Sequence, residues 1–200
     1  MLQQIERWIY QSVGGKLCLE RDLPVIARLA VEEVVDWPRT GRQTVEELNN
    51  VEKAYLGTKI VIGFKHWLGA SNGKIFAVDI DGIEVGIKHV FNARCYISRA
   101  RIGRPLIVIQ TDLSNSRVSL AILVAHSSQI RLKARPNSLS RDAEHSRLIL
   151  RWLCTNCEIR KSAVFTQMVV MYRKLNEQQR QQMRDLVDGD NKLPSSALPN

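Results

Sequence analysis

The chain has 200 residues, and its shares of hydrophobic (44%) and charged (24%) residues exclude a disordered, collagen-like or disulfide-scaffold protein. No apolar run approaches the ~20 residues of a membrane helix, and the N-terminus lacks the apolar core of a signal peptide. The net charge is +9. These features predict a folded, cytoplasmic protein that does not contact a membrane.

The first half of the chain predicts helices. Apolar residues recur at helical spacing over residues 2–13 and 23–37, and a polar turn follows at 38–43. Thr44 and Glu47 have the spacing of a capping box, which predicts a long helix from there to residue 68. The expected apolar face of this helix consists of Val45, Leu48, Val51, Tyr55 and Ile62.

The second half predicts strands and then helices, so the whole chain has the pattern of an α+β domain with one core. Asp81-Gly82 is a hairpin signal between strands at 74–80 and 83–90, and two more strands are expected at 106–111 and 119–126. A basic loop at 131–141, a helix at 143–153 and a turn at Cys154–Cys157 should follow. Residues 162–187 predict a polar C-terminal helix, and residues 188–200 predict a disordered tail.

The positive charge is concentrated in one segment. Residues 91–161 contain thirteen bases and four acids, and eleven of the bases are arginine. Arginine binds phosphate bidentately and can also bind guanine edges, so a nucleic-acid partner is the leading interpretation. A basic face that is merely solvated remains the alternative.

The four cysteines include a single Cys-x-x-Cys, Cys154 to Cys157. A tetrahedral zinc site needs two further ligands, and no second motif or suitably spaced histidine supplies them. Reduced structural thiols are the expectation, with zinc or redox chemistry as the alternative. His66, His89 and His126 are expected to be structural or surface residues.

The predicted hairpin separates two kinds of side chain. Phe76, Val78, Ile80, Ile83, Val85 and Ile87 fall on an apolar face, whereas the other face carries Ala77, Asp79, Glu84, Gly86 and Lys88. Carboxylates and a lysine on one face of a strand pair are typical of metal-dependent phosphodiester nucleases. In those enzymes the acids hold Mg²⁺ and the lysine orients the attacking water.

Three segments carry a resemblance to a known family: Arg39-Thr-Gly-Arg42, Val51-Glu-Lys-Ala-Tyr-Leu-Gly-Thr58 and Gly82-Ile-Glu-Val-Gly-Ile-Lys88. In this order and spacing they resemble the endonuclease domain of the NaeI-type restriction endonucleases, over residues 30–155. The resemblance implies a restriction-endonuclease-like core in residues 1–161, with a central mixed β-sheet and hairpin flanked by helices. It also implies double-stranded DNA as the partner and a homodimer. A DNA-binding protein of this kind is expected in the cytoplasm, associated with the nucleoid.

The sequence departs from the family at the residues that would hold the metal. Where the resemblance places acids on the helix and on the two hairpin strands, this chain has Val61, Ala77 and Gly86, and only Lys88 remains. We therefore expect a catalytically inactive DNA-binding protein without a metal cofactor, a regulator of transcription or DNA occupancy. The alternative is an active Mg²⁺-dependent type II endonuclease whose metal site has moved to Asp79 and Glu84, beside Lys88.

The residues expected to contact DNA follow the second hairpin strand or lie in the basic loop, and a sequence does not separate phosphate contacts from base contacts. They are Arg94, Arg99, Arg101, Arg104, Arg131, Lys133 and Arg135. Arg117, at a hairpin tip, is expected to be solvated. A third hypothesis is a protein-interaction module that docks a partner through the polar helix at 176–187.

Overall fold

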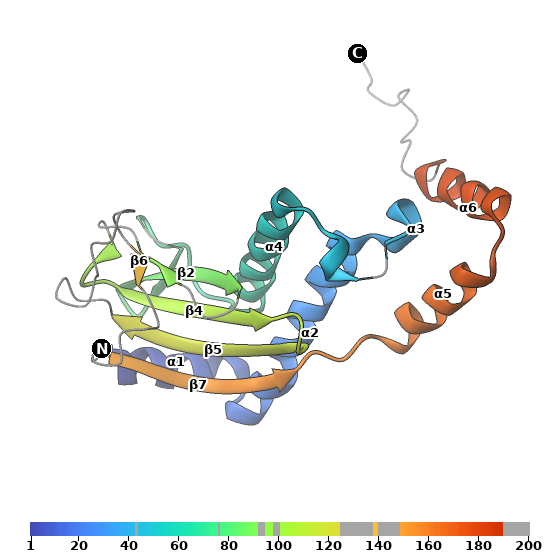
Figure 1. The fold of residues 1–200 in the computed structure, drawn as a ribbon. Helices are drawn as coiled ribbons and strands as arrows, with labels where there is room; N and C mark the ends of the chain where they lie inside the picture. Colours follow the sequence, from blue (N-terminus) through green and yellow to red (C-terminus); the bar gives the residue numbers. More distant parts are fainter. Residues whose placement is uncertain are drawn as a thin grey trace, which may run out of the picture.

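The computed structural model describes residues 1–42, 44–75, 77–91, 95–97, 101–124, 138–139 and 149–189, and its centre is a five-stranded mixed sheet (Figure 1). The strand order is β1-β2-β4-β5-β7, in which β2 and β4 are parallel and the other neighbours are antiparallel. The predicted α+β fold with a mixed sheet, a hairpin and flanking helices is confirmed. The strands are β1 (Val78–Ile80), β2 (Ile83–Phe91), β4 (Pro105–Asp112), β5 (Arg117–Val124) and β7 (Ile149–Glu158), with a separate pair β3 (Cys95–Tyr96) and β6 (Ser138–Leu139).

The N-terminal helices pack on the sheet. Helix α1 (Leu2–Val13) has the predicted bounds and ends at Gly14, whose φ of 82° suits glycine. Helix α2 (Lys16–Val35) begins well before the predicted residue 23 and contains Pro24. Its earlier part buries Leu19 in the core, as its later part buries Leu23. A short helix α3 (Trp37–Thr40) replaces part of the expected turn. Helices α1 and α2 contact β5, and α2 also contacts β7.

The long helix α4 (Asn50–Leu68) corrects two predictions. The Thr44–Glu47 capping box exists, but it opens only a 3-10 turn, η1 (Val45–Glu47), and a second capping box at Asn49 and Glu52 begins α4. Three residues of the predicted apolar face, Val51, Tyr55 and Ile62, are at least half exposed. The buried face is instead formed by Leu56, Ile60, Phe64 and Leu68, because α4 carries two apolar stripes and only one meets the sheet.

The hairpin has the predicted register over its described ladder. Val78 pairs with Val85, Asp79 with Glu84 and Ile80 with Ile83, around a turn in which both Asp81 and Gly82 have positive φ. The first strand is shorter than predicted, because the ladder starts at Val78. Ala77 therefore does not pair with Gly86, which corrects the expected cross-strand contact.

The predicted helix at 143–153 is wrong for its described part. Residues 149–153 belong to β7, which pairs antiparallel with β5 at the edge of the sheet. Leu153 and Cys154 bury their side chains, so tertiary pairing outweighs the local helical spacing. The expected turn at Cys154–Cys157 is a β-bulge within this strand, where Asn156 has a φ of 54°.

Two helices follow the sheet where one was predicted. Helix α5 (Ala163–Lys174) and helix α6 (Glu177–Gly189) are separated at Leu175 and Asn176, and Asn176 accepts a hydrogen bond from the backbone of Gln179. Figure 1 shows this pair leading away from the sheet, with α6 beside α3. The predicted disordered tail lies outside the described residues from 190 onward.

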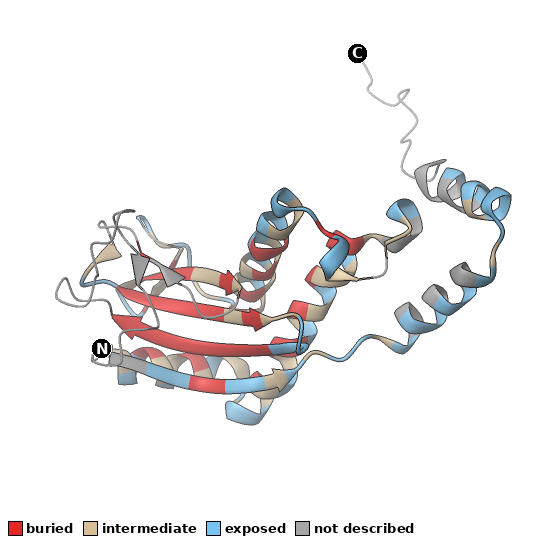
Figure 2. Cartoon of the chain, viewed as in Figure 1, coloured by how far each residue is buried: buried red, intermediate tan, exposed pale blue. Residues whose placement is uncertain are grey.

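Figure 2 shows that the buried residues lie along the strands and on the helices packed against them. They form two clusters, and the alternation of side chains along the strands places these on opposite faces of the sheet. The larger part joins the sheet to α1, α2 and α4, and the smaller part consists of Val90, Ile97, Leu106, Val108 and Leu123. Alternating side chains of β4, such as Leu106 and Ile107, therefore enter different clusters. In the described ranges, no helix has the length and apolar character needed to cross a membrane.

Candidate functional site

A pocket of about 620 Å³ opens between α4 and β2, and we refer to it as the α4–β2 pocket. Helix α4 lines it with Thr58 and Val61, β2 with Lys88 and His89, and the turn before β4 with Arg101. None of the described lining residues is acidic. The pocket thus brings together Val61, Lys88 and Arg101, which sequence reasoning singled out for different reasons.

Gly86 lies close to Arg101, one of the residues that line this pocket. It lies on the same face of β2 as Lys88, and in the sheet it is the partner of Leu106 on β4. A Cβ atom at position 86 would lie 2.4 Å from Leu106 Cδ2 and 3.5 Å from Arg101 Nη1. The guanidinium of Arg101 therefore reaches the place where a side chain at 86 would begin.

His89 is a structural residue, as predicted, and it sets the distance between α4 and β2. Its Nε2 atom is hydrogen-bonded to the hydroxyl of buried Thr111 at 2.8 Å, and its ring packs edge-on against Phe91. On the α4 side, a Cβ atom at Gly57 would lie 2.7 Å from His89 Nδ1. Burial lowers the pKa of His89 to about 4, so the imidazole is neutral at physiological pH.

Asp79 and Glu84 are the residues of the alternative metal site. Their carboxylates accept hydrogen bonds from the backbone of the hairpin and of the chain before it. Glu84 accepts hydrogen bonds from the backbone N–H groups of Lys74 (2.6 Å) and Ile75 (3.2 Å). Asp79 accepts one from Gly82 (2.9 Å) in the turn. Neither residue is among those that line the α4–β2 pocket.

The donor set of the pocket does not fit Mg²⁺, which takes oxygen ligands that include carboxylates. The described lining supplies no carboxylate, since Val61 is apolar and Lys88 and Arg101 are cationic. Within the part of the chain that the structure describes, there is also no group of three His, Cys, Asp or Glu residues that could hold a metal ion.

Two of the seven residues expected to contact DNA are described. Arg101 is half-buried at the α4–β2 pocket, and Arg104 is exposed in the same turn, where its backbone N–H donates to Arg101 O. Arg94, Arg99, Arg131, Lys133 and Arg135 lie outside the described residues. Arg117, expected to be solvated, is exposed and donates a hydrogen bond to Asn156 O.

The cysteines of the Cys-x-x-Cys are thiols in the sheet. Cys154 is buried, and burial raises its pKa to about 12. Cys157 is half-buried, and burial raises its pKa as well. Both groups are therefore protonated at neutral pH, which is the state of unreactive structural thiols.

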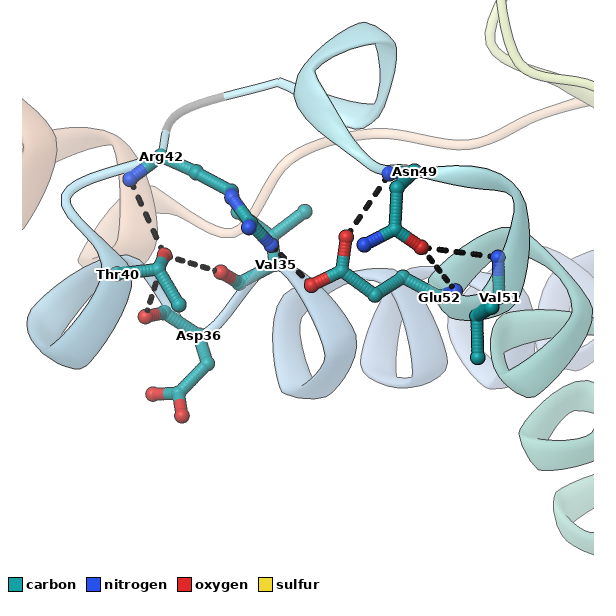
Figure 3. Close-up of polar contacts among 7 residues, drawn as sticks. All are labelled: Val35, Asp36, Thr40, Arg42, Asn49, Val51 and Glu52. Carbon is teal, nitrogen blue, oxygen red and sulfur yellow. Dashed lines mark hydrogen bonds and ion pairs between the residues drawn. The ribbon is translucent and has the colours of Figure 1, made fainter.

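Polar contacts join residues of the segments 39–42 and 51–58 (Figure 3). Thr40 closes the end of α2 by donating to Val35 O and accepting from Arg42 N, while Arg42 forms an ion pair with Glu52. Glu52 in turn accepts a hydrogen bond from the backbone of Asn49 at the start of α4. These contacts fix the connection between α2 and α4, so they explain the two segments by a structural role alone. The sequence alone did not predict this role, because the contacts form only when the fold places the two segments together.

The mixed sheet, its hairpin and the helices around it define a restriction-endonuclease-like α+β fold. The family model described as restriction endonuclease NaeI matches residues 21–192, and the chain belongs to this family. The match runs from α2 through α6, so the two C-terminal helices are part of the matched region. A search of curated proteins finds no match to the chain.

Proposed function

We propose that this chain is a double-stranded DNA-binding protein that keeps the NaeI-type endonuclease fold without its cleavage chemistry. It acts by occupying DNA, as a regulator of transcription or of access to a site. The observation that carries this proposal is the absence of acidic side chains among the described residues lining the α4–β2 pocket. Without carboxylates to hold Mg²⁺, the barrier to phosphodiester cleavage stays close to its uncatalysed height.

Membership of a restriction endonuclease family supports DNA as the partner. The charge distribution gives independent support, because the whole net charge of +9 is concentrated in residues 91–161. Arg101 and Arg104 place part of this charge beside the pocket. Cationic side chains at such a place favour phosphate contacts, which position a protein on a duplex.

The proposal includes a homodimer, since a two-fold protein matches the two-fold symmetry of a duplex site. Exposed apolar residues on α4 and α5 would be buried in such an interface. They are Val51, Tyr55, Ile62, Val170 and Met171. Sedimentation velocity with and without duplex DNA measures the oligomeric state. A monomer in both conditions contradicts this part of the proposal.

The test is a pair of assays on the full chain. Supercoiled plasmid and mixed linear duplexes are incubated with protein in Mg²⁺ and in Mn²⁺, next to a gel shift in EDTA. We expect binding without cleavage, and the affinity should fall steeply with salt because binding releases counterions from the duplex. An active NaeI-type enzyme is the positive control for cleavage.

Two results contradict the proposal and identify its competitors. Cleavage that is lost in Glu84→Ala but kept in Glu158→Ala establishes the moved metal site at Asp79 and Glu84, with Mg²⁺ as cofactor. The hydrogen bonds of both carboxylates to the backbone oppose this outcome. Absence of binding at low salt favours the protein-interaction module instead.

A further inference from the structure

A second cavity, of about 240 Å³, shares no described lining residue with the α4–β2 pocket, and we refer to it as the α2–η1 cavity. Its walls come from α2, from η1 with the preceding Thr44, from the β4–β5 turn and from the segment that follows β7. Five aliphatic side chains form its apolar part; they are Val31, Val35, Val45, Leu113 and Ile159. The fold thus gathers apolar residues from distant parts of the sequence around a space that the candidate site does not use.

The charges of the described lining sum to zero. Arg28 and Lys161 are basic, whereas Glu32 and Glu46 are acidic. The α4–β2 pocket differs in this respect, since its described lining contains no acidic residue. Because binding favours complementary charge, a balanced lining opposes a phosphate or another dianion and suits a ligand without net charge.

One acid and one base of this lining are already paired within the protein. Arg28 Nη1 lies 3.7 Å from Glu32 Oε1, and this oxygen also accepts a hydrogen bond from Ser162 N at 3.2 Å. Glu46 and Lys161 are exposed, and neither forms an ion pair with any residue that the structure describes. The cavity therefore offers a ligand one acidic and one basic partner.

The volume of the cavity limits the size of its ligand. Pockets for drug-sized molecules measure about 300–1,000 Å³, which exceeds the 240 Å³ found here. Liquid water occupies about 30 Å³ per molecule, so the cavity corresponds to roughly eight waters and to a ligand of about eight to ten non-hydrogen atoms. A nucleotide is much larger than this, whereas an amino acid with a branched aliphatic side chain has this size.

We propose that the α2–η1 cavity binds a free α-amino acid with an aliphatic side chain, such as leucine. Lys161 pairs with the carboxylate of the ligand, Glu46 pairs with its ammonium group, and the aliphatic side chain lies among the apolar residues of the walls. Burial of the side chain supplies most of the affinity, and the two exposed ion pairs supply specificity. The inference does not depend on the proposed function, because nothing in it requires DNA.

The first experiment measures binding to the full chain without DNA, by isothermal titration calorimetry with L-leucine, L-isoleucine and L-valine. We expect saturable binding at one site per chain. Glycine should bind at least tenfold more weakly than leucine, because it has no side chain to bury. Isoamylamine, which lacks the carboxylate of leucine, and 4-methylpentanoic acid, which lacks its ammonium group, should each bind at least threefold more weakly. Absence of binding by all three amino acids overturns the inference, and so does equal binding of leucine and its two singly charged analogues.

Surface variants then test the roles of the two charges. Lys161→Gln should bind leucine no better than isoamylamine, and Glu46→Gln should bind leucine no better than 4-methylpentanoic acid, because each variant lacks the partner of one ligand charge. The control is Lys174→Gln, which removes an exposed positive charge from α5 and should keep the wild-type preferences. Wild-type preferences in both Lys161→Gln and Glu46→Gln overturn the inference.

Amide chemical shifts locate the bound amino acid. Addition of L-leucine to the ¹⁵N-labelled full chain should shift the resonances of residues 28–35, 44–46, 113–116 and 159–161, which surround the cavity. The residues around the α4–β2 pocket should not respond. Shifts confined to the α4–β2 pocket overturn the inference, and none of these results changes the standing of the proposed function.

Discussion

The imidazole of His89 lies where a side chain at Gly57 would have to begin, since Nδ1 is 2.7 Å from the Cβ position of that residue. The absence of a side chain at Gly57 lets α4 approach β2 closely, next to the pocket. Gly57 of the segment Val51–Thr58 is therefore needed for packing, whatever the chemistry of the site.

Gly57→Ala should destabilise the protein by about 1–2 kcal/mol, because the overpacking at His89 exceeds the gain in helix propensity. Gly63→Ala on the same helix is the control, since its new Cβ would lie 3.1 Å from Ile26 Cγ2 only, and its effect should be smaller. Urea unfolding measures both free energies. A larger loss of unfolding free energy in Gly63→Ala than in Gly57→Ala would show that the His89 side chain moves aside at little energetic cost.

His89 should make stability depend on pH. Burial lowers its pKa to about 4, whereas an unfolded histidine titrates near 6.5, so the unfolded state binds the proton more readily. The stabilising contribution is complete above pH 6.5 and is lost as pH falls toward 4, up to about 3 kcal/mol. His89→Gln should flatten the urea-unfolding profile over this range, and His66→Gln, at an exposed site, should leave it unchanged.

The ion pair between Arg42 and Glu52 should behave as a unit with the start of α4. Arg42→Ala and Glu52→Gln should each lower the midpoint of thermal unfolding, and the double variant should lose less than the sum. The hydrogen bond from Arg42 holds the pKa of Glu52 below its ordinary value, so this contribution is present above the unfolded pKa and is lost as pH falls through the folded one. Additive losses would contradict the coupling.

Glu84 should matter for stability and not for DNA. Glu84→Ala removes the acceptor of two backbone N–H groups at residues 74 and 75 and should cost about 1–3 kcal/mol in urea unfolding. Glu158→Ala, whose carboxylate is half exposed beside Arg160, should cost much less. A fall in DNA affinity at unchanged stability would instead place Glu84 at the interface.

The two thiols of β7 should react with Ellman's reagent at different rates. Cys157 is partly accessible, whereas Cys154 is buried with its pKa raised to about 12. In a chain carrying Cys18→Ser and Cys95→Ser, one thiol should react in the native state and the second only after urea unfolding. Rapid reaction of both native thiols would contradict the burial of Cys154.

The hairpin could be predicted from the sequence because its information is local. Asp81-Gly82 specifies a two-residue turn, the turn fixes the register, and the alternation then assigns each side chain to a face. The common face of Gly86 and Lys88 follows from this register. The short first strand does not, because Glu84 binds the backbone of residues 74 and 75 through contacts that no alternation reveals.

The buried face of α4 and the strand β7 could not be predicted in the same way. Helix α4 has apolar residues on two sides, and the choice of Leu56 and Ile60 over Val51 and Tyr55 depends on where the sheet lies. Strand β7 obtains its structure from pairing with β5, a partner distant in sequence. For the same reason, the position of Arg101 at the pocket required the fold.

The close approach of Gly86 and Leu106 limits which residues position 86 accepts. Leu106 is fully buried among Val90, Val108 and Leu123, so any side chain at position 86 would have to displace a packed neighbour. The two positions are therefore coupled: a larger residue at 86 is expected to require a smaller one at 106.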